Sequence, residues 1–341
     1  MTLTKEYFAK LENDRSIDIL SSILKNKHWQ NRREAAISLG KIPDLEVLQP
    51  LYNSLDDQDV RVLVKILGSL EQLYSNPELD WKDFPLKIKT LVEDGPIHSY
   101  TDDVTEGINR IITAYLKEEK IDENKLREDL NLIFTDLKEF YYSDDLWFLP
   151  LYDVFVDSLE VKNKIVKKTI VDIFGISFLY LLDSDLMILP KHIAEQFQQI
   201  LVLLKDADHG VVIAGLKTLS YHTYLNKNII YEASDLFIVK NKEIHLAVIE
   251  MLKKQMMFNE SISVRFAALD ELGLYLETVE HPIKEDGLDK KNLKIRNSLV
   301  KYILEILQEV KETVAHPSLK MDDLTMKIDW TIDAFKKLVD T

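Results

Sequence analysis

The 341-residue sequence contains no cysteine and only nine glycines and nine prolines. The absence of cysteine excludes disulfide bonds, thiol nucleophiles and zinc sites built on thiolates. It is compatible with a reducing compartment. The scarcity of glycine and proline, with abundant Leu, Ile, Lys, Glu and Asp, favours helices over a sheet that would need many turns.

Long apolar runs are also missing. The segment Met1–Phe8 has no apolar run of signal-peptide length. The longest apolar stretch, Ile173–Leu182, covers about ten residues, which is roughly half of a membrane span. We therefore expect a cytoplasmic protein with no membrane association, in which this stretch is a buried helix.

Positive charge is scarce in one part of the chain. The formal net charge is -15, and residues 76–160 hold 21 acidic side chains against 9 basic ones, a net charge of -12. The remaining residues are therefore close to balanced. A surface this acidic repels a phosphate backbone, so the sequence argues against a nucleic-acid partner and favours a basic one.

A phrase of about ten residues recurs along the chain. It occurs four times in full and a fifth time one residue short, at residues 31–40, 166–175, 211–220, 264–273 and 60–68. With a helical period, its apolar positions fall on one stripe, as for Val264, Ala268 and Leu272. Repetition of one helical unit predicts a stacked solenoid.

A second helix is expected before three of these copies. These partner helices are predicted at residues 45–55, 192–204 and 242–257. Small residues in the phrases, such as Ala36, Ala214 and Ala268, are expected where helices of adjacent repeats cross closely. Acids in the turns, including Asp59 and Asp206, can cap the second helix of each hairpin.

The pattern Asp-x-x-Val-Arg-x-x-Ala-Ala-x-x-Leu-Gly resembles the second helix of a HEAT repeat, within the armadillo-like class. The segments Asp57–Arg61 and Ser263–Ala268 match it best. This resemblance implies an all-α, right-handed superhelix of helical hairpins. It also implies that Arg32, Arg61 and Arg265 are structural, each pairing with a turn aspartate of a neighbouring repeat.

The sequence predicts one solenoid over residues 1–341. Proline and glycine cluster in residues 76–107, which predicts an irregular insertion there. Residues 293–341 are expected to form C-terminal capping helices, at 293–314 and 324–339.

Motifs for catalysis or cofactor binding are not evident. The segment Gly210–Lys217 has the first spacing of a phosphate loop, but Leu216 occupies the position of the essential lysine. Deoxyhypusine hydroxylases bind metal on HEAT-like helices through His-Glu pairs. None of the eight histidines here precedes a glutamate, and no His-x-x-x-His occurs. We therefore predict no metal, no cofactor and no enzymatic activity.

One segment, Phe140–Phe155, interleaves aromatic residues with carboxylates. Aromatic side chains can anchor a partner while carboxylates pair with its Lys or Arg side chains. The alternative is a local aromatic core beneath solvated acids. The candidate binding residues in this segment are Tyr141, Tyr142, Asp144, Asp145, Trp147, Tyr152 and Asp153.

The leading hypothesis is a non-catalytic scaffold, adaptor or neutralising partner that binds a basic protein. An alternative is a HEAT-like enzyme or ligand-handling chaperone of the phycobilin-lyase kind, in which Tyr141, Trp147 and their neighbours would line a pocket. A third possibility is a helical-repeat DNA glycosylase, for which Trp29, Arg32 and Arg33 could supply part of a site.

Overall fold

The computed structural model is all-α, as the sequence predicts. It describes residues 2–93, 99–139, 149–175, 201–225, 235–285, 290–314 and 322–339. Within these ranges it contains helices, turns and no strand. None of the helices in these ranges has the length and apolarity needed to span a bilayer.

The chain divides into two compact units, Met1–Ser177 and Phe178–Thr341. The prediction of one continuous solenoid over residues 1–341 stays a prediction.

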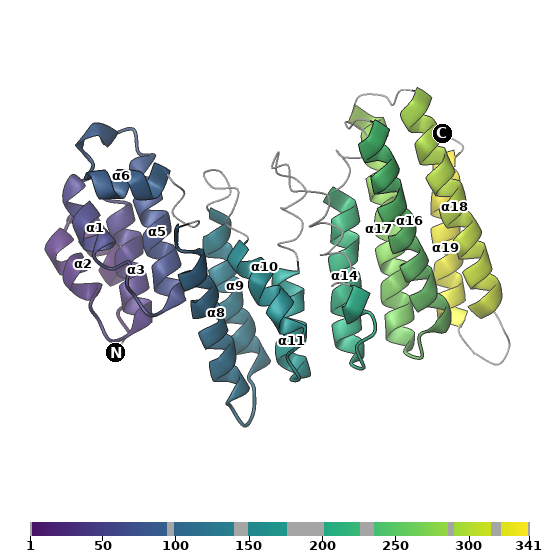
Figure 1. The fold of residues 1–341 in the computed structure, drawn as a ribbon, viewed down its shortest axis with the longest axis horizontal. Helices are drawn as coiled ribbons and strands as arrows, with labels where there is room; N and C mark the ends of the chain where they lie inside the picture. Colours follow the sequence, from purple (N-terminus) through teal and green to yellow (C-terminus); the bar gives the residue numbers. More distant parts are fainter. Residues whose placement is uncertain are drawn as a thin grey trace. The chain divides into compact units, whose positions relative to one another are not determined.

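The first unit is a set of helices that pack mainly on near neighbours in the sequence (Figure 1). Its α-helices are α1 (Lys5–Asn13), α2 (Ile17–Ile23), α3 (Trp29–Gly40), α4 (Leu48–Tyr52), α5 (Val60–Tyr74), α6 (Leu86–Glu93), α8 (Thr101–Leu116), α9 (Glu123–Lys138), α10 (Leu149–Ser158) and α11 (Lys164–Phe174). Helices α3, α5, α9 and α11 form one layer, in which each packs on the next. Helices α2, α4, α8 and α10 pack against this layer. Helix α2 contacts α3, α4 contacts α5, α10 contacts α11, and α8 contacts α5, α9 and α11.

The repeated phrase forms a helix at every copy in this unit. In α5, Val60, Leu63 and Leu67 are buried on the stripe that the helical period predicts. Asp59 caps this helix, because its carboxylate accepts a hydrogen bond from the backbone N–H of Arg61. Asn163 caps α11 in the same way.

Small residues allow α3 and α5 to approach closely. A Cβ atom added to Gly40 would lie 2.7 Å from the Cβ of Ser69. The Ser69 hydroxyl donates a hydrogen bond of 2.9 Å to the carbonyl oxygen of Ala36. Glycine at the end of the phrase is therefore required here by contact between two helices.

The segment predicted as an insertion, residues 76–107, contains regular elements. It holds a 3-10 turn, η2 (Trp81–Asp83), then α6 and the first part of α8. Gly107 lies inside α8, where an added Cβ would meet the Val60 side chain at 2.6 Å. Glycine at this position allows a close crossing of α8 and α5.

The second unit consists of longer helices (Figure 1). They are α14 (His209–Leu225), α16 (Asp235–Phe258), α17 (Ile262–Glu285), α18 (Lys290–Val314) and α19 (Asp322–Val339). Helix α17 packs on both α14 and α19, while α16 packs on α17 and α18. This alternation of neighbours gives two layers of stacked hairpins.

The helices expected from the sequence are present in this unit where it is described. The copies at 211–220 and 264–273 lie within α14 and α17, and the two C-terminal helices are α18 and α19. Of the partner helices, 242–257 lies in α16, and 45–55 corresponds in the first unit to η1 (Leu45–Val47) with α4. The partner helix predicted at residues 192–204 lies largely outside the described residues.

Candidate functional site

The aromatic and acidic segment is described only at its C-terminal end. Tyr141, Tyr142, Asp144, Asp145 and Trp147 lie outside the described residues.

The remaining two candidates, Tyr152 and Asp153, are on α10. Tyr152 is half-buried and Asp153 is exposed, whereas Phe155 is fully buried. In the described part of the segment, an apolar core therefore lies beneath an exposed acid.

Asp153 belongs to a group of like charges. The pKa of its carboxyl is raised, first by partial desolvation and then by the nearby Asp157 and Asp102. These three carboxylates come from α10 and α8, so the acidic surface extends over two helices.

A larger site lies among helices α3, α5, α8 and α9. It is a cleft of about 620 Å³, here called the Trp29 cleft. Its lining residues are Trp29, Gln30, Arg61, Ile111, Ala114, Tyr115, Glu118, Lys125, Glu128, Asp129 and Leu132.

The inner part of the Trp29 cleft is a connected polar network. The Arg61 guanidinium lies over the indole of Trp29, 3.7 Å from the ring centroid. Arg61 donates to both carboxylate oxygens of Asp59, at 2.9 and 2.8 Å, and to Asp129 Oδ1 at 2.6 Å. The Tyr115 hydroxyl donates to the other oxygen of Asp129 at 2.8 Å. The single guanidinium thus faces two carboxylates.

The protonation states of this network are fixed by its partners. Burial by itself lowers the pKa of Arg61, but the hydrogen bonds and charges of Asp59 and Asp129 outweigh it and raise the pKa overall. Burial, followed by the hydrogen bond to Asp129, raises the pKa of Tyr115. Arg61 therefore stays charged and Tyr115 stays a hydrogen-bond donor at neutral pH, which suits a structural role better than proton transfer.

The rim of the Trp29 cleft differs from its inner part. Glu118, Lys125 and Glu128 are exposed, and neither glutamate forms an ion pair with another described residue. The partly exposed side chains of Ile111 and Leu132 form an apolar wall of the cleft. Such a wall can hold the methylene stem of a Lys or Arg side chain while the glutamates pair with its charge.

Most of the Trp29 cleft was not foreseen from the sequence. The sequence suggests a role for Trp29 only together with Arg32 and Arg33, as part of a nucleic-acid site. The residues that face it from α8 and α9 come from the acidic segment 76–160, which lacks the repeated phrase. The net charge of that segment was the only signal that could have pointed to them.

The two arginines next to Trp29 point to other carboxylates. Arg32 donates to both oxygens of Asp57, at 2.6 and 2.8 Å, and these hydrogen bonds are the main reason why the pKa of Arg32 is raised. Arg33 makes a bidentate contact with Asp136 of α9, with bonds of 2.8 and 3.2 Å. Both guanidinium groups are thus engaged in holding helices together.

The other structural residues predicted from the repeats make different contacts. Arg61 contacts the acid of its own turn and Asp129, whereas Arg265 donates to the backbone carbonyl of Asn259 at 2.6 Å. The turn before Arg265 offers asparagine and serine, together with Glu260. Asp206 accepts a hydrogen bond from the backbone N–H of Asp208 at 2.9 Å, within the turn before α14.

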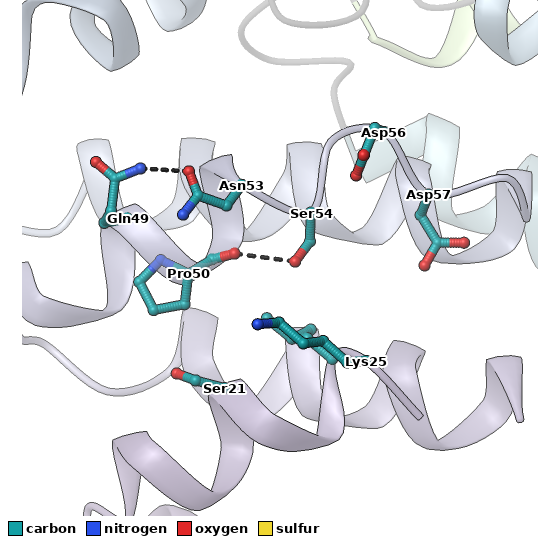
Figure 2. Close-up of a pocket in the computed structure, with 9 residues that line it drawn as sticks. Ser21, Lys25, Gln49, Pro50, Asn53, Ser54, Asp56 and Asp57 are labelled. Atoms are coloured by element: carbon teal, nitrogen blue, oxygen red, sulfur yellow. Dashed lines mark hydrogen bonds between the residues drawn. The ribbon is translucent and has the colours of Figure 1, made fainter. Parts of the chain in front are cut away.

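A second pocket, of about 470 Å³, lies between α2 and the segment that begins with α4. Figure 2 shows Lys25 facing Pro50 and Ser54, with Asp56 and Asp57 on the turn that follows. The pocket is lined by Ser21, Leu24, Lys25, Gln49, Pro50, Asn53, Ser54, Asp56 and Asp57. Its acids are Asp56 and Asp57, and Asp57 already pairs with Arg32, so the pocket offers a basic ligand fewer unpaired carboxylates than the Trp29 cleft.

A third, smaller cleft of about 250 Å³ is more acidic. Its charged lining consists of Asp56, Asp57, Asp103, Glu106 and Arg110. Arg110 is the only basic member of this lining, and it lies 4.0 Å from Glu106. Negative charge therefore predominates along the α8 side of the unit.

Within the described ranges, no group of three or more His, Asp or Glu side chains is arranged to hold a metal ion.

Comparisons with known proteins give little similarity. No known family profile matches the sequence, and a search of curated proteins found no match. Among solved structures, the crystal structure of an engineered protein from the Northeast Structural Genomics Consortium is similar to this chain, with 12% sequence identity and a TM-score of 0.32. The alignment covers 94% of this chain and 97% of that chain.

Proposed function

We propose that the protein is a non-catalytic scaffold or neutralising partner that binds a basic protein, and that the Trp29 cleft is a contact site. The observation that carries this proposal is the unequal charge of the cleft. Its two basic groups, Arg61 and Lys125, face four carboxylates. Arg61 is matched by Asp59 and Asp129, while Glu118 and Glu128 lie exposed at the rim with Lys125, beside an apolar wall. A Lys or Arg side chain of a partner is the complementary group.

Two further observations support a basic partner. The small acidic cleft and the Asp102, Asp153 and Asp157 group extend the negative surface over α8 and α10. The segment that contains Tyr141, Asp144 and neighbouring residues directly precedes α10, and we include it in the proposed contact surface.

We also propose that the repeats are of the HEAT kind. The pairing of Arg32 with Asp57 supports this assignment, because it joins a phrase arginine to the turn acid before the next phrase. Buried bidentate contacts of this sort fix the spacing between hairpins.

The binding proposal can be tested by calorimetric titration with a peptide of alternating lysine and leucine. Combining Glu118→Gln with Glu128→Gln should weaken binding about fivefold, since each rim carboxylate contributes roughly 0.5 kcal/mol. Added salt should weaken binding of the unmodified protein through screening.

A matched control removes two exposed acids of the second unit, Glu260→Gln with Glu305→Gln. This variant has the same net charge as the test variant. Equal weakening by both would show that the peptide senses total charge and not the cleft, which would contradict the proposed site. Co-purification of a stoichiometric basic protein would identify the natural partner.

A second candidate function is ligand handling, and one observation favours it. The Trp29 cleft has a volume within the range of small-molecule sites, with Trp29, Tyr115 and several carboxylates in its lining. Native mass spectrometry of the purified protein distinguishes the two. A bound small or coloured molecule would favour ligand handling.

A further inference from the structure

The pocket shown in Figure 2, here called the Lys25 pocket, carries two charges that no ion pair uses. Lys25 directly follows α2, and Asp56 lies in the turn before α5. Both side chains are exposed, and neither forms an ion pair with another described residue. The remaining charged member of the lining, Asp57, is matched by its bidentate contact with Arg32. One base and one acid are therefore left for a ligand.

These two charges face different parts of the pocket. Figure 2 shows the ammonium end of Lys25 turned toward Pro50 and Ser54, whereas Asp56 lies on the turn beyond Ser54. The pocket has a volume of about 470 Å³, which is within the range of small-molecule sites. A ligand can therefore contact both charges without breaking an ion pair of the folded protein.

Uncharged polar groups line the same pocket. Exposed Gln49 donates a hydrogen bond of 2.5 Å to Asn53 Oδ1, and the amide N–H groups of Asn53 are left to donate to a ligand. The buried Ser21 hydroxyl has no hydrogen-bond partner among the described residues. A polar ligand atom that reached this hydroxyl would remove the cost of leaving it unpaired. Leu24 and Pro50 supply apolar surface for carbon atoms.

We propose that the Lys25 pocket binds a small zwitterion of the amino-acid class, either a free amino acid or a dipeptide. Its carboxylate lies beside Lys25 and accepts charge-assisted hydrogen bonds, and its ammonium group donates to Asp56. The Asn53 amide is placed to bind a carbonyl oxygen of the same ligand. The site is separate from the Trp29 cleft, so this inference is independent of the proposed function.

Ligands with a single charge fit this pocket less well. An anion beside Lys25 also lies near Asp56, and a cation beside Asp56 also lies near Lys25. A molecule that carries both charges finds an opposite charge at each end. Because such a ligand has no net charge, its binding depends on these local contacts and not on the net charge of -15.

Titration of the full chain with glycine and with glycylglycine, followed by NMR of the ligand, tests the proposal. We expect a dissociation constant of about 1 mM, because ligands of this size make few contacts. Tighter binding of glycine would identify a free amino acid as the ligand, and tighter binding of glycylglycine would identify a dipeptide.

Two matched ligands test the need for both charges. N-acetylglycine is glycylglycine without its amino group, and glycinamide is glycine with its carboxylate replaced by an amide. Each should bind about fivefold more weakly than its parent, as expected for the loss of one exposed charge pair.

Single substitutions locate the site. Lys25→Gln and Asp56→Asn should each weaken glycylglycine binding about fivefold. Asp56→Asn should have less effect on N-acetylglycine, because that ligand has no ammonium group. Lys27→Gln and Asp83→Asn are matched controls, since both residues are exposed in the same unit and lie outside the pocket lining. They should leave binding unchanged.

Several outcomes would overturn the proposal. One is the absence of saturable binding of glycine and glycylglycine up to about 20 mM. Another is equal binding of N-acetylglycine and glycylglycine, which would indicate an anion site, or of glycinamide and glycine, which would indicate a cation site. Equal effects of the test and control substitutions would place the ligand elsewhere. Unchanged melting temperatures would confirm that the variants fold.

Discussion

Burial raises the pKa of both Asp136 and Asp153, but the neighbours of the two carboxylates differ. Asp136 is buried and is held by Arg33, with Lys65 at 3.6 Å. Asp153 lies near Asp157 and Asp102 and raises the electrostatic energy of the folded state. Asp136 joins helices through its ion pairs, whereas Asp153 is repelled by neighbouring carboxylates on a surface that we propose for binding.

The raised pKa of Asp153 gives a signed prediction. Its ionisation is harder in the folded than in the unfolded chain, so its contribution to stability falls as pH rises from the unfolded pKa through the folded one. Asp153→Asn should therefore increase the free energy of unfolding at pH 7. Because Asp153 is exposed, the gain should be only a few tenths of a kcal/mol.

Urea denaturation at pH 7 and near pH 4 measures this difference. The gain should shrink at the lower pH, where the carboxyl of the unfolded chain is itself about half protonated. Asp333→Asn is a suitable control, since Asp333 is exposed on α19 in the other unit. A loss of stability at pH 7 would contradict the prediction and would indicate an attractive role for Asp153.

The contacts of single residues were predictable where the repeated phrase supplies both partners. Arg32 and Asp57 belong to consecutive copies, and they meet. Arg61 also binds Asp129, which is 68 residues away in a segment without the phrase. No local pattern indicates such a pair, since it depends on how α9 packs against α5.

At the scale of elements, some glycines lie where two helices touch closely, and others lie where there is open space. Gly40→Ala should lower the free energy of unfolding by about 1–3 kcal/mol, because its Cβ would meet Ser69 backbone and side-chain atoms that cannot move far. Gly273→Ala should raise it by up to about 1 kcal/mol, because Gly273 lies within α17 with no atom within 4 Å of an added Cβ.

The two substitutions are chemically identical, so each controls for the other. Thermal unfolding followed by circular dichroism gives the two values. Similar shifts in both variants would show that helix propensity alone decides the outcome and that the α3 and α5 helices can move apart.

Element positions were predicted well where the phrase occurs and less well elsewhere. The apolar stripe of each copy, together with a polar cap, was sufficient to place α3, α5, α11, α14 and α17. The cluster of proline and glycine in residues 76–107 suggested an irregular segment, yet α6 and part of α8 are found there. Gly107 lies in α8 because of its contact with Val60, a long-range reason that sequence composition does not reveal.

For the whole molecule, net charge is the dominant electrostatic property. A net charge of -15 produces repulsion that salt screens over about 10 Å, whereas partly buried ion pairs such as Arg32 with Asp57 are screened less. Raising the salt concentration from about 10 to 150 mM should therefore raise the melting temperature by a few degrees. Calorimetry at pH 7 measures this shift. A decrease would show that ion pairs outweigh the repulsion between like charges.

The fold class of the whole chain was predictable, because one repeated helical unit cannot bury its apolar stripe alone. The division of the chain into two compact units was not predictable. The repeats resemble one another on both sides of it, so the sequence pattern gives no sign of a boundary. The Trp29 cleft combines residues from four helices, and only the acidity of residues 76–160 indicated the chemistry of its rim.

The contact between Arg33 and Asp136 has a consequence for the kinetics of folding. These residues are 103 positions apart, whereas most helices of the unit pack on near neighbours. Loop closure of this length is costly until α5 and α9 have docked, so we expect the pair to form after the folding barrier. An interaction that is absent from the transition state slows unfolding without speeding folding. We therefore expect the contact to prolong the lifetime of the folded unit.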